Sequence, residues 1–197
     1  MHSHKDLRSS SVMLMIQILS IIFSILLALG LNDWKESRNN KQLALTTLRN
    51  LKDELGNNRK AIEAALRDQR IFMRSLENGV SQLNSGKEKA LALPEINLPD
   101  VLTTAWETAL VTKAMVYIDY DVILKLSEIY LQQKWLASLE DKVFQTILSP
   151  YSYEKKNSGN LAKSLYASLK NIMEVEGKLL AMYDITLKKI ETITEQH

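Results

Sequence analysis

The uncharged stretch VMLMIQILSIIFSILLALGL occupies residues 12–31 and is followed directly by charged sequence. A helix of this length rises about 30 Å, which matches the hydrocarbon thickness of a bilayer. Its many Leu, Ile, Val and Phe residues favour insertion strongly enough to outweigh Gln17 and two serines. The stretch therefore predicts a transmembrane helix, and Trp34 just beyond it predicts an anchor at the membrane interface.

A cleaved signal peptide is the main alternative, because Ala28-Leu29-Gly30 has the small-x-small pattern of a cleavage site. The apolar block is longer than a secretory hydrophobic region of about 7–15 residues, which favours a retained anchor. The cations on its two sides nearly balance, so charge alone does not set the orientation. Since a short tail stays inside easily, we expect a cytoplasmic N-terminus and a domain outside the cytoplasm.

One face of the apolar block carries small and polar side chains. Ser20, Ser24 and Ala28 recur every four residues, and Gln17 lies one turn earlier on the same face. Small residues at this spacing let two membrane helices approach closely, and an intramembrane glutamine can hydrogen-bond across the pair. We predict a self-association seam. The alternative is that the serines bond to their own preceding turn and the glutamine is simply tolerated.

The remainder of the chain has helical periodicity throughout. Apolar residues recur at heptad-like spacing after the membrane exit, with interruptions at Asn58 and Gln69. Glycines and prolines break the pattern between residues 79 and 99, and Ser149-Pro150 ends a later helical segment. Asp100 is a plausible N-cap. No segment alternates between apolar and polar residues, so we expect helices at about 32–78, 100–117, 120–148 and 160–194.

These patterns predict an all-α fold with three regions. The first is a short flexible tail, the second is the transmembrane helix, and the third is an α-helical domain (residues 1–11, 12–31 and 32–197). The membrane helix is expected to continue into an antiparallel helical bundle of about four helices.

The composition excludes several kinds of chemistry. The chain has 25 Lys and Arg against 23 Asp and Glu, a net charge of +2 that is too balanced for a nucleic-acid binder. It has no cysteine, and its three histidines lie at positions 2, 4 and 197. Asp119 and Asp121 resemble the start of a calcium loop, but Leu124 and Tyr130 occupy its required glycine and acid positions, so helix capping is the simpler interpretation. We expect no catalytic residue, cofactor or metal.

Arginines are distributed unevenly. Six of the seven fall between Arg38 and Arg74. Four cations can share one face of the first long helix, and together with Trp106 they form a candidate contact for an anion or a partner (Lys60, Arg67, Arg70, Arg74). A solvated face paired with nearby acids is the alternative.

The run ILLALGLNDWKESRNNKQLALTTLRNLKDELGNNRKAIE resembles the opening of an uncharacterised family of small bacterial single-pass membrane-anchored helical proteins. The resemblance rests on the residues that follow the apolar span, which include Asn32, Trp34 and Glu36. It rests also on the second-half run AWETALVTKAMVYIDYDVILKLSEIYLQQ. Lys113-Ala114 stands where members often carry a glycine-containing turn. The resemblance implies a bacterial inner membrane, a periplasmic domain and no assigned activity.

Two functional hypotheses follow. The first is a non-enzymatic membrane-anchored interaction or assembly module, with the lipid bilayer and either a second copy or a membrane protein as partners. The second is an extracytoplasmic sensory or ligand-binding bundle that signals through a membrane partner. A pocket with convergent polar groups distinguishes the second from the first.

Overall fold

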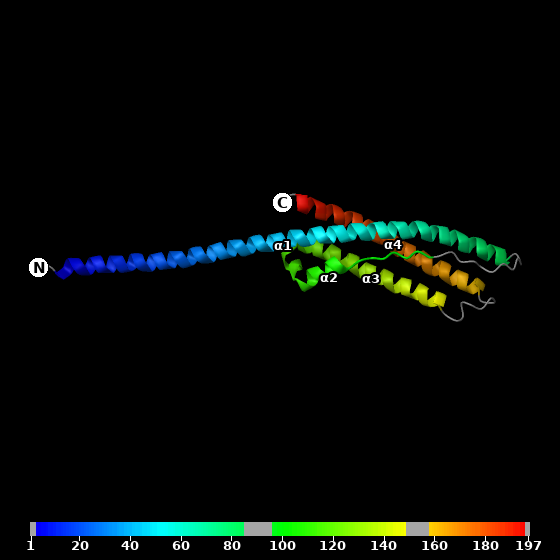
Figure 1. The fold of residues 1–197 in the computed structure, drawn as a ribbon, viewed down its shortest axis with the longest axis horizontal. Helices are drawn as coiled ribbons and strands as arrows, with labels where there is room; N and C mark the ends of the chain where they lie inside the picture. The colour runs from blue at the N-terminus through cyan, green and yellow to red at the C-terminus, as the bar shows by residue number, and fades with distance from the viewer. Residues whose placement is uncertain (1–2, 85–95, 149–157, 196–197) are drawn as a thin grey trace. The chain divides into compact units, whose positions relative to one another are not determined.

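The computed structural model describes residues 3–84, 96–148 and 158–195, and all regular structure in these ranges is helical. The order is α1 (Ser3–Asn84), α2 (Thr104–Val111), the 3-10 helix η1 (Ala114–Tyr117), α3 (Tyr120–Leu148) and α4 (Ser158–Glu195) (Figure 1). His2, His197, Ser149-Pro150 and most of the predicted connection at 79–99 lie outside the described residues. The expected all-α fold class is confirmed.

The chain divides into two compact units, Met1–Ala44 and Leu45–His197, which are described separately. The first unit consists of the N-terminal part of α1. The large apolar side chains between Met13 and Leu31 are about half exposed or more, from 48% at Ile22 to 74% at Met13. This segment is long and apolar enough to cross a membrane, with a mean hydropathy of 2.6, a criterion that a signal sequence also meets.

Residues 3–11, which were expected to form a flexible tail, belong to α1. The helix then passes through the apolar block and beyond residue 32 without a break, in agreement with the expected continuation of the membrane helix. No proline occurs within α1, so the helix continues past Gly30 and past the N-cap-type residues Asn32 and Asp33 without losing a backbone hydrogen bond. One helix therefore contains the predicted tail, the membrane helix and the first helix of the domain.

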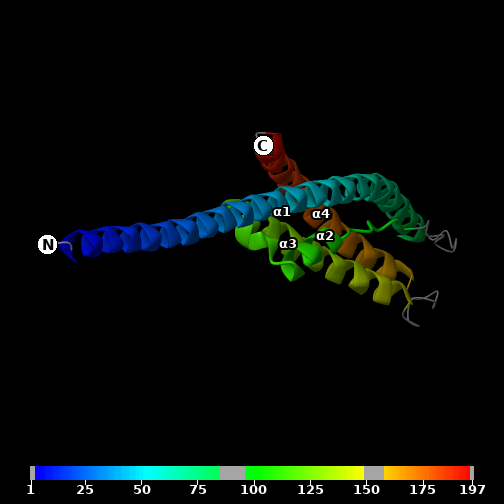
Figure 2. The same ribbon diagram turned by 60° about the vertical axis from the view of Figure 1, so that its left-hand side comes forward.

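In the second unit, α3 and α4 pack against each other, and side-chain hydrogen bonds join each of them to α1. Seven apolar residues of α1 with heptad-like spacing are all buried, as that spacing predicts (Leu48, Leu51, Leu55, Ile62, Ala65, Phe72 and Leu76). α3 and α4 lie side by side in both Figure 1 and Figure 2. The predicted bounds of these two helices agree with the observed ones to within two residues.

Cross-links between helices define the direction of α4. Residue numbers rise along α1 while their partners on α4 fall, so the two helices are antiparallel (Lys52 with Glu191 at 2.8 Å, Arg59 with Asp184 at 2.7 Å, Gln69 with Glu176 at 2.8 Å, Glu77 with Tyr166 at 2.9 Å). The outer ion pairs are partly exposed and contribute little individually, so they mainly record the register.

The start of α3 confirms the capping interpretation of Asp119. Its Oδ1 accepts hydrogen bonds from the backbone N–H groups of Asp121, at 3.0 Å, and Val122, at 3.4 Å. Lys189 of α4 lies 3.9 Å from Asp119 and 3.8 Å from Asp121. The acidic pair therefore begins a helix and faces a lysine.

The predicted helix at 100–117 is wrong in its bounds. The chain enters α2 with Thr103 at the N-cap in place of Asp100, and α2 ends at Val111. Lys113 then adopts φ 56°, in the left-handed region, before η1 begins. A glycine normally marks such a turn, and its absence from the sequence is the reason why the break was not predicted.

Candidate functional site

The carboxylate of Glu54 lies at the centre of a polar site between α1, α2 and α3. Only 7% of Glu54 is exposed. Its Oε1 accepts a 2.6 Å hydrogen bond from the Tyr130 hydroxyl of α3, and its Oε2 accepts a 2.7 Å bond from the backbone N–H of Ala105. Both oxygens therefore have partners, and the side chain links three helices.

Glu54 takes over the role of an N-cap for α2. The first backbone N–H groups of a helix lack intrahelical partners, and a negative charge there is stabilised by the helix dipole. Thr103, at the N-cap position, does not bond to the backbone through its side chain. Its hydroxyl donates to Glu107 at 2.9 Å instead. The Ala105 N–H is satisfied by a residue about fifty positions earlier in the chain.

Tyr130 is held as a neutral hydrogen-bond donor. Its ring stacks on Trp106 with centroids 4.7 Å apart and an interplanar angle of 17°. Burial raises the pKa of the Tyr130 hydroxyl far above its usual value, and the hydrogen bond to Glu54 adds to this effect. Deprotonation at physiological pH is therefore excluded, and the hydroxyl acts as a fixed structural donor.

Asn58 fastens the segment that precedes α2. Its Nδ2 donates to the carbonyl oxygen of Leu102 at 2.7 Å, and its Oδ1 accepts from the N–H of Leu102 at 2.8 Å. The Asn58 side chain is 1% exposed, and its two hydrogen bonds satisfy both backbone groups of Leu102. Farther along, Asn97 donates to Asp68 at 2.7 Å. These contacts hold residues 97–105 against α1.

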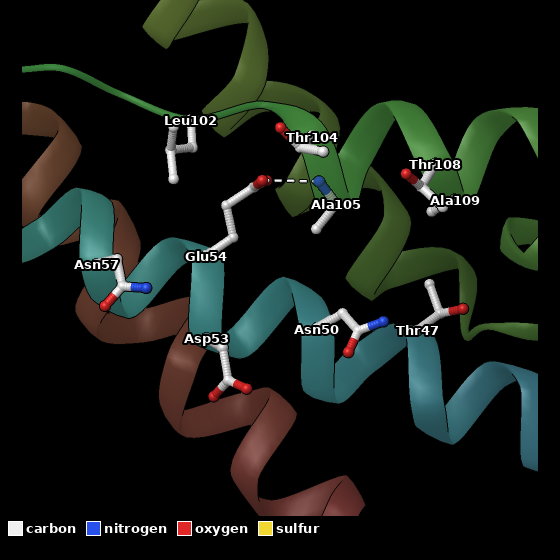
Figure 3. A pocket seen from close by; sticks show the side chains of 10 residues that line it. All are labelled: Thr47, Asn50, Asp53, Glu54, Asn57, Leu102, Thr104, Ala105, Thr108 and Ala109. Carbon is white, nitrogen blue, oxygen red and sulfur yellow. Dashed lines mark hydrogen bonds between the residues drawn. The ribbon is translucent and has the colours of Figure 1, made fainter.

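A pocket of about 380 Å³ opens beside Glu54. Figure 3 shows polar side chains of α1 on one wall and α2 with its preceding residues on the other (Thr47, Asn50, Asp53, Glu54 and Asn57; Leu102, Thr104, Ala105, Thr108 and Ala109). The lining consists of carboxylates, amides, hydroxyls and aliphatic groups, without a cation. This chemistry suits a cationic or hydroxyl-rich ligand and is unsuited to an anion.

A second polar cluster is buried between α1, α3 and α4. Gln69 Nε2 donates a 2.8 Å hydrogen bond to Glu176 Oε1, and both side chains are fully buried. Glu176 Oε2, Glu140 Oε1 and Gln69 Oε1 are buried without a hydrogen-bond partner. Burial raises the pKa of Glu176 to about 7. Burial, followed by the charge of Glu176, raises the pKa of Glu140 to about 7.

This cluster can hold a proton at neutral pH. Two carboxyl groups in one buried site repel each other when both are ionised, so one keeps its proton. A protonated carboxyl can donate a hydrogen bond to one of the acceptor oxygens that lack a partner. On the same two helices, α3 and α4, but toward Glu54, Gln133 Nε2 donates to the Tyr183 hydroxyl at 2.8 Å, and burial raises the pKa of Tyr183 to about 12.

The predicted cationic face does not meet Trp106 at one site. Lys60, Arg67, Arg70 and Arg74 are all exposed. Trp106 is half-buried against Tyr130, at the level of Glu54. Arg67 lies thirteen residues beyond Glu54 on α1, which is about 20 Å along the helix. The structure therefore separates the tryptophan from the arginines.

The predicted seam residues Gln17, Ser20, Ser24 and Ala28 are exposed in the first unit. The Ser24 hydroxyl donates to the backbone oxygen of Ser20 at 2.8 Å, as the alternative interpretation expected. The Trp34 ring is 62% exposed, and the guanidinium of Arg38 lies 5.7 Å from its centroid. A serine hydroxyl that donates to its own helix can still accept a bond from a neighbouring helix.

Sequence reasoning missed both polar clusters. Their sequence signal was the pair of interruptions at Asn58 and Gln69, where polar residues stand in an apolar pattern. Glu54, Tyr130 and Glu176 carry no such signal, because their partners are distant in the chain. Within residues 3–84, 96–148 and 158–195, no group of three or more His, Asp or Glu side chains is arranged to hold a metal ion.

Comparisons with protein-family models, with curated proteins and with solved structures find no match to this chain. The family resemblance suggested by the membrane-exit sequence thus gains no support from them. Any functional conclusion therefore depends on the chemistry and geometry of the chain itself.

Proposed function

We propose that this chain is a non-enzymatic protein, anchored in a membrane by residues 12–31, whose helical domain is an interaction and assembly module. In this proposal α1, α3 and α4 form an antiparallel bundle, with α2 laid across it. The antiparallel cross-links between α1 and α4 and the apolar core support this arrangement. The partner is a second copy of the chain.

An exposed apolar stripe on α3 carries the proposal. Tyr120, Leu124, Leu131 and Trp135 are exposed by 75%, 47%, 69% and 51%. Their spacing of four, seven and four residues puts them on one face of the helix, and we call this face the α3 stripe. The opposite face of α3 is buried in the core from Val122 to Val143.

Exposed apolar residues that stand singly are normal, whereas several large ones on one helix face mark a candidate interaction site, here in two pairs on either side of the exposed Ser127 and Glu128. An isologous contact between two copies would bury the α3 stripe against itself and needs no other partner. The spacing of Ser20, Ser24 and Ala28 in the apolar segment supports self-association independently of this stripe. Two separate regions of the chain thus favour a homo-oligomer.

The absence of cysteine makes a direct test available. A single Leu131→Cys variant in native membranes should form a disulfide-linked dimer on mild oxidation. Ile185→Cys is the matched control, because Ile185 is 60% exposed on α4 and lies outside the stripe. Adding Trp135→Lys should reduce the crosslink at position 131, and Ser24→Leu should reduce it if the apolar segments associate as well. Monomers at every position, or crosslinks only to another membrane protein, would contradict self-association.

We also propose that the domain lies outside the cytoplasm of a bacterial inner membrane. The cations on the two sides of the apolar segment nearly balance, so the support comes from the length of the following domain, which can be translocated largely regardless of its charge. A membrane-impermeant maleimide should label a Lys178→Cys variant in intact spheroplasts, since Lys178 is exposed. Labelling only after lysis would reverse the orientation.

A sensory or ligand-binding domain is the second candidate, and the pocket beside Glu54 favours it. Its acidic and amide lining directs the search to cationic and hydroxyl-rich compounds. Thermal-shift screening of the full chain in detergent tests this candidate. A hit that is lost in Asp53→Ala and kept in Asp141→Ala would support it, because Asp141 is an exposed acid outside the pocket lining. A screen without hits would count against it.

A further inference from the structure

A second exposed apolar group lies on the turn that connects α2 to α3. Leu110, Val111, Val116 and Tyr117 are exposed by 52%, 83%, 78% and 46%, and we call them the turn patch. They lie on both sides of Lys113, which is also exposed. Val111 and Val116 are more exposed than any residue of the α3 stripe, so this patch needs its own explanation.

The turn patch lies at the end of the second unit where α1 enters it. Asn58 bonds to Leu102, Glu54 bonds to Ala105, and Thr47 lines the same pocket as Thr108. Residue numbers fall on α1 as they rise toward α2, so α2 runs back toward Leu45. Figures 1 and 2 both show the turn after α2 at this end of the helices that follow residue 45.

The tether limits how far this end can lie from the anchor. Fourteen residues, 32–45, join the end of the apolar segment to the start of the second unit, and all of them belong to α1. A helical connection of this length spans about 21 Å. If residues 12–31 cross a bilayer, this tether keeps the end of the unit that carries the turn patch within about 21 Å of the apolar segment, and a tilt of residues 32–45 toward the membrane plane brings it to the surface.

The chemistry of the turn patch fits a membrane interface. Two valines and a leucine supply aliphatic surface, Tyr117 supplies an amphipathic ring, and Lys113 supplies a cation that can reach the headgroups. The neighbouring carboxylates Asp119 and Asp121 face Lys189, whose single positive charge offsets one of the two negative charges at this edge. The expected insertion is driven by the aliphatic groups, so anionic lipid is not required.

We infer that the turn between α2 and α3 docks onto the surface of the bilayer in which the chain is anchored. This inference rests on the proposed membrane anchor. Insertion of Val111 and Val116 gives the domain a second contact with the membrane. The domain is thereby held in one orientation that tethering through α1 alone would not impose.

Spin labels on single cysteines in the full chain test this contact. The chain is reconstituted in phosphatidylcholine vesicles, and each label is probed with oxygen, which concentrates in lipid, and with a water-soluble nickel chelate. Labels at Val111→Cys and Val116→Cys should shift toward oxygen relative to Phe144→Cys. Phe144 is a suitable control because it is 54% exposed and lies far along α3, about 36 Å from Tyr120.

A label at Ile22→Cys separates the two proposals. Oxygen access at position 22 together with water access at positions 111 and 116 would overturn the docking and leave the anchor intact. Water access at position 22 would overturn both proposals. Low access to both reagents at positions 111 and 116 would show that protein covers the patch, which would also overturn docking to lipid.

Discussion

The hydroxyl of Tyr130 donates a 2.6 Å hydrogen bond to Oε1 of Glu54, and this bond joins α3 to α1 in the interior of the domain. The other carboxylate oxygen satisfies the N-terminus of α2. The buried side chain of Glu54 thus links three helices. Removing one of its hydrogen-bond partners should cost more free energy of unfolding than the intact bond contributes.

Removal of the Tyr130 hydroxyl should destabilise the domain strongly. Tyr130→Phe keeps the ring that stacks on Trp106 but leaves the buried Oε1 of Glu54 without its donor. We expect a loss of about 1–3 kcal/mol in the free energy of unfolding. Denaturation of the full chain in detergent, followed by circular dichroism, measures it. Tyr120→Phe is the matched control, because Tyr120 is 75% exposed, and an equal effect of both variants would contradict the assigned role of the bond.

The two hydrogen bonds between Asn58 and Leu102 should hold α2 against α1. Asn58→Ala removes two hydrogen bonds and leaves both backbone groups of Leu102 without their partner. We expect a cost of about 1–3 kcal/mol and faster amide exchange in α2. Asn57→Ala, at an exposed neighbouring position, should change neither quantity. Unchanged exchange in α2 with Asn58→Ala would show that these two hydrogen bonds are dispensable.

The buried carboxyl pair should make stability depend on pH. Glu140 and Glu176 have pKa values raised from 4.5 to about 7, so the folded state binds more protons than the unfolded state between these limits. Their contribution is therefore fully present below about pH 4.5 and is lost as the pH rises through about 7. We expect Glu176 to make the domain about 2 kcal/mol more stable at pH 5 than at pH 8, and the less buried Glu140 to add a smaller amount.

Glu176→Gln should remove the contribution of Glu176 to this pH dependence and leave the part that burial gives to Glu140, because the amide keeps an acceptor for Gln69 and carries no charge. Glu174→Gln is the control. Its hydrogen bond to Lys178, followed by the charge of Lys178, lowers the pKa of the exposed Glu174 carboxyl, so its small effect has the opposite sign. Denaturation midpoints from pH 5 to pH 8 test both variants. An unchanged pH slope in Glu176→Gln would rule out Glu176 as a source.

Lys113 should be replaceable by glycine with a gain in stability. The left-handed conformation at φ 56° costs an L-residue about 1–2 kcal/mol, whereas the extra chain entropy of glycine costs roughly 0.5–1 kcal/mol. We expect Lys113→Gly to stabilise the domain by up to about 1 kcal/mol. Lys134→Gly, in the middle of α3, should instead destabilise it by about 1 kcal/mol. A loss of stability in Lys113→Gly would point to a role for the lysine side chain.

The helical fold was predictable because helical periodicity depends on residues that lie within a few turns of one another in the sequence. The spacing from Leu48 to Leu76 identified the buried face of α1, and the bounds of α3 and α4 followed from periodicity and breakers. The boundary at Lys113 was missed because the turn lacks its usual glycine. The helix continues past residue 32, as expected, because no proline interrupts α1.

The sequence by itself determined the helix class, the apolar segment, and the buried faces of the long helices, because these depend on the order of residues within a few turns. Only the tertiary structure decided that Glu54, Asn58 and Gln69 are buried and bonded, and that Trp106 is distant from Arg67. A polar residue in an apolar seam costs free energy unless a partner meets it. That partner comes from another helix, at a distance in the chain that local patterns do not encode.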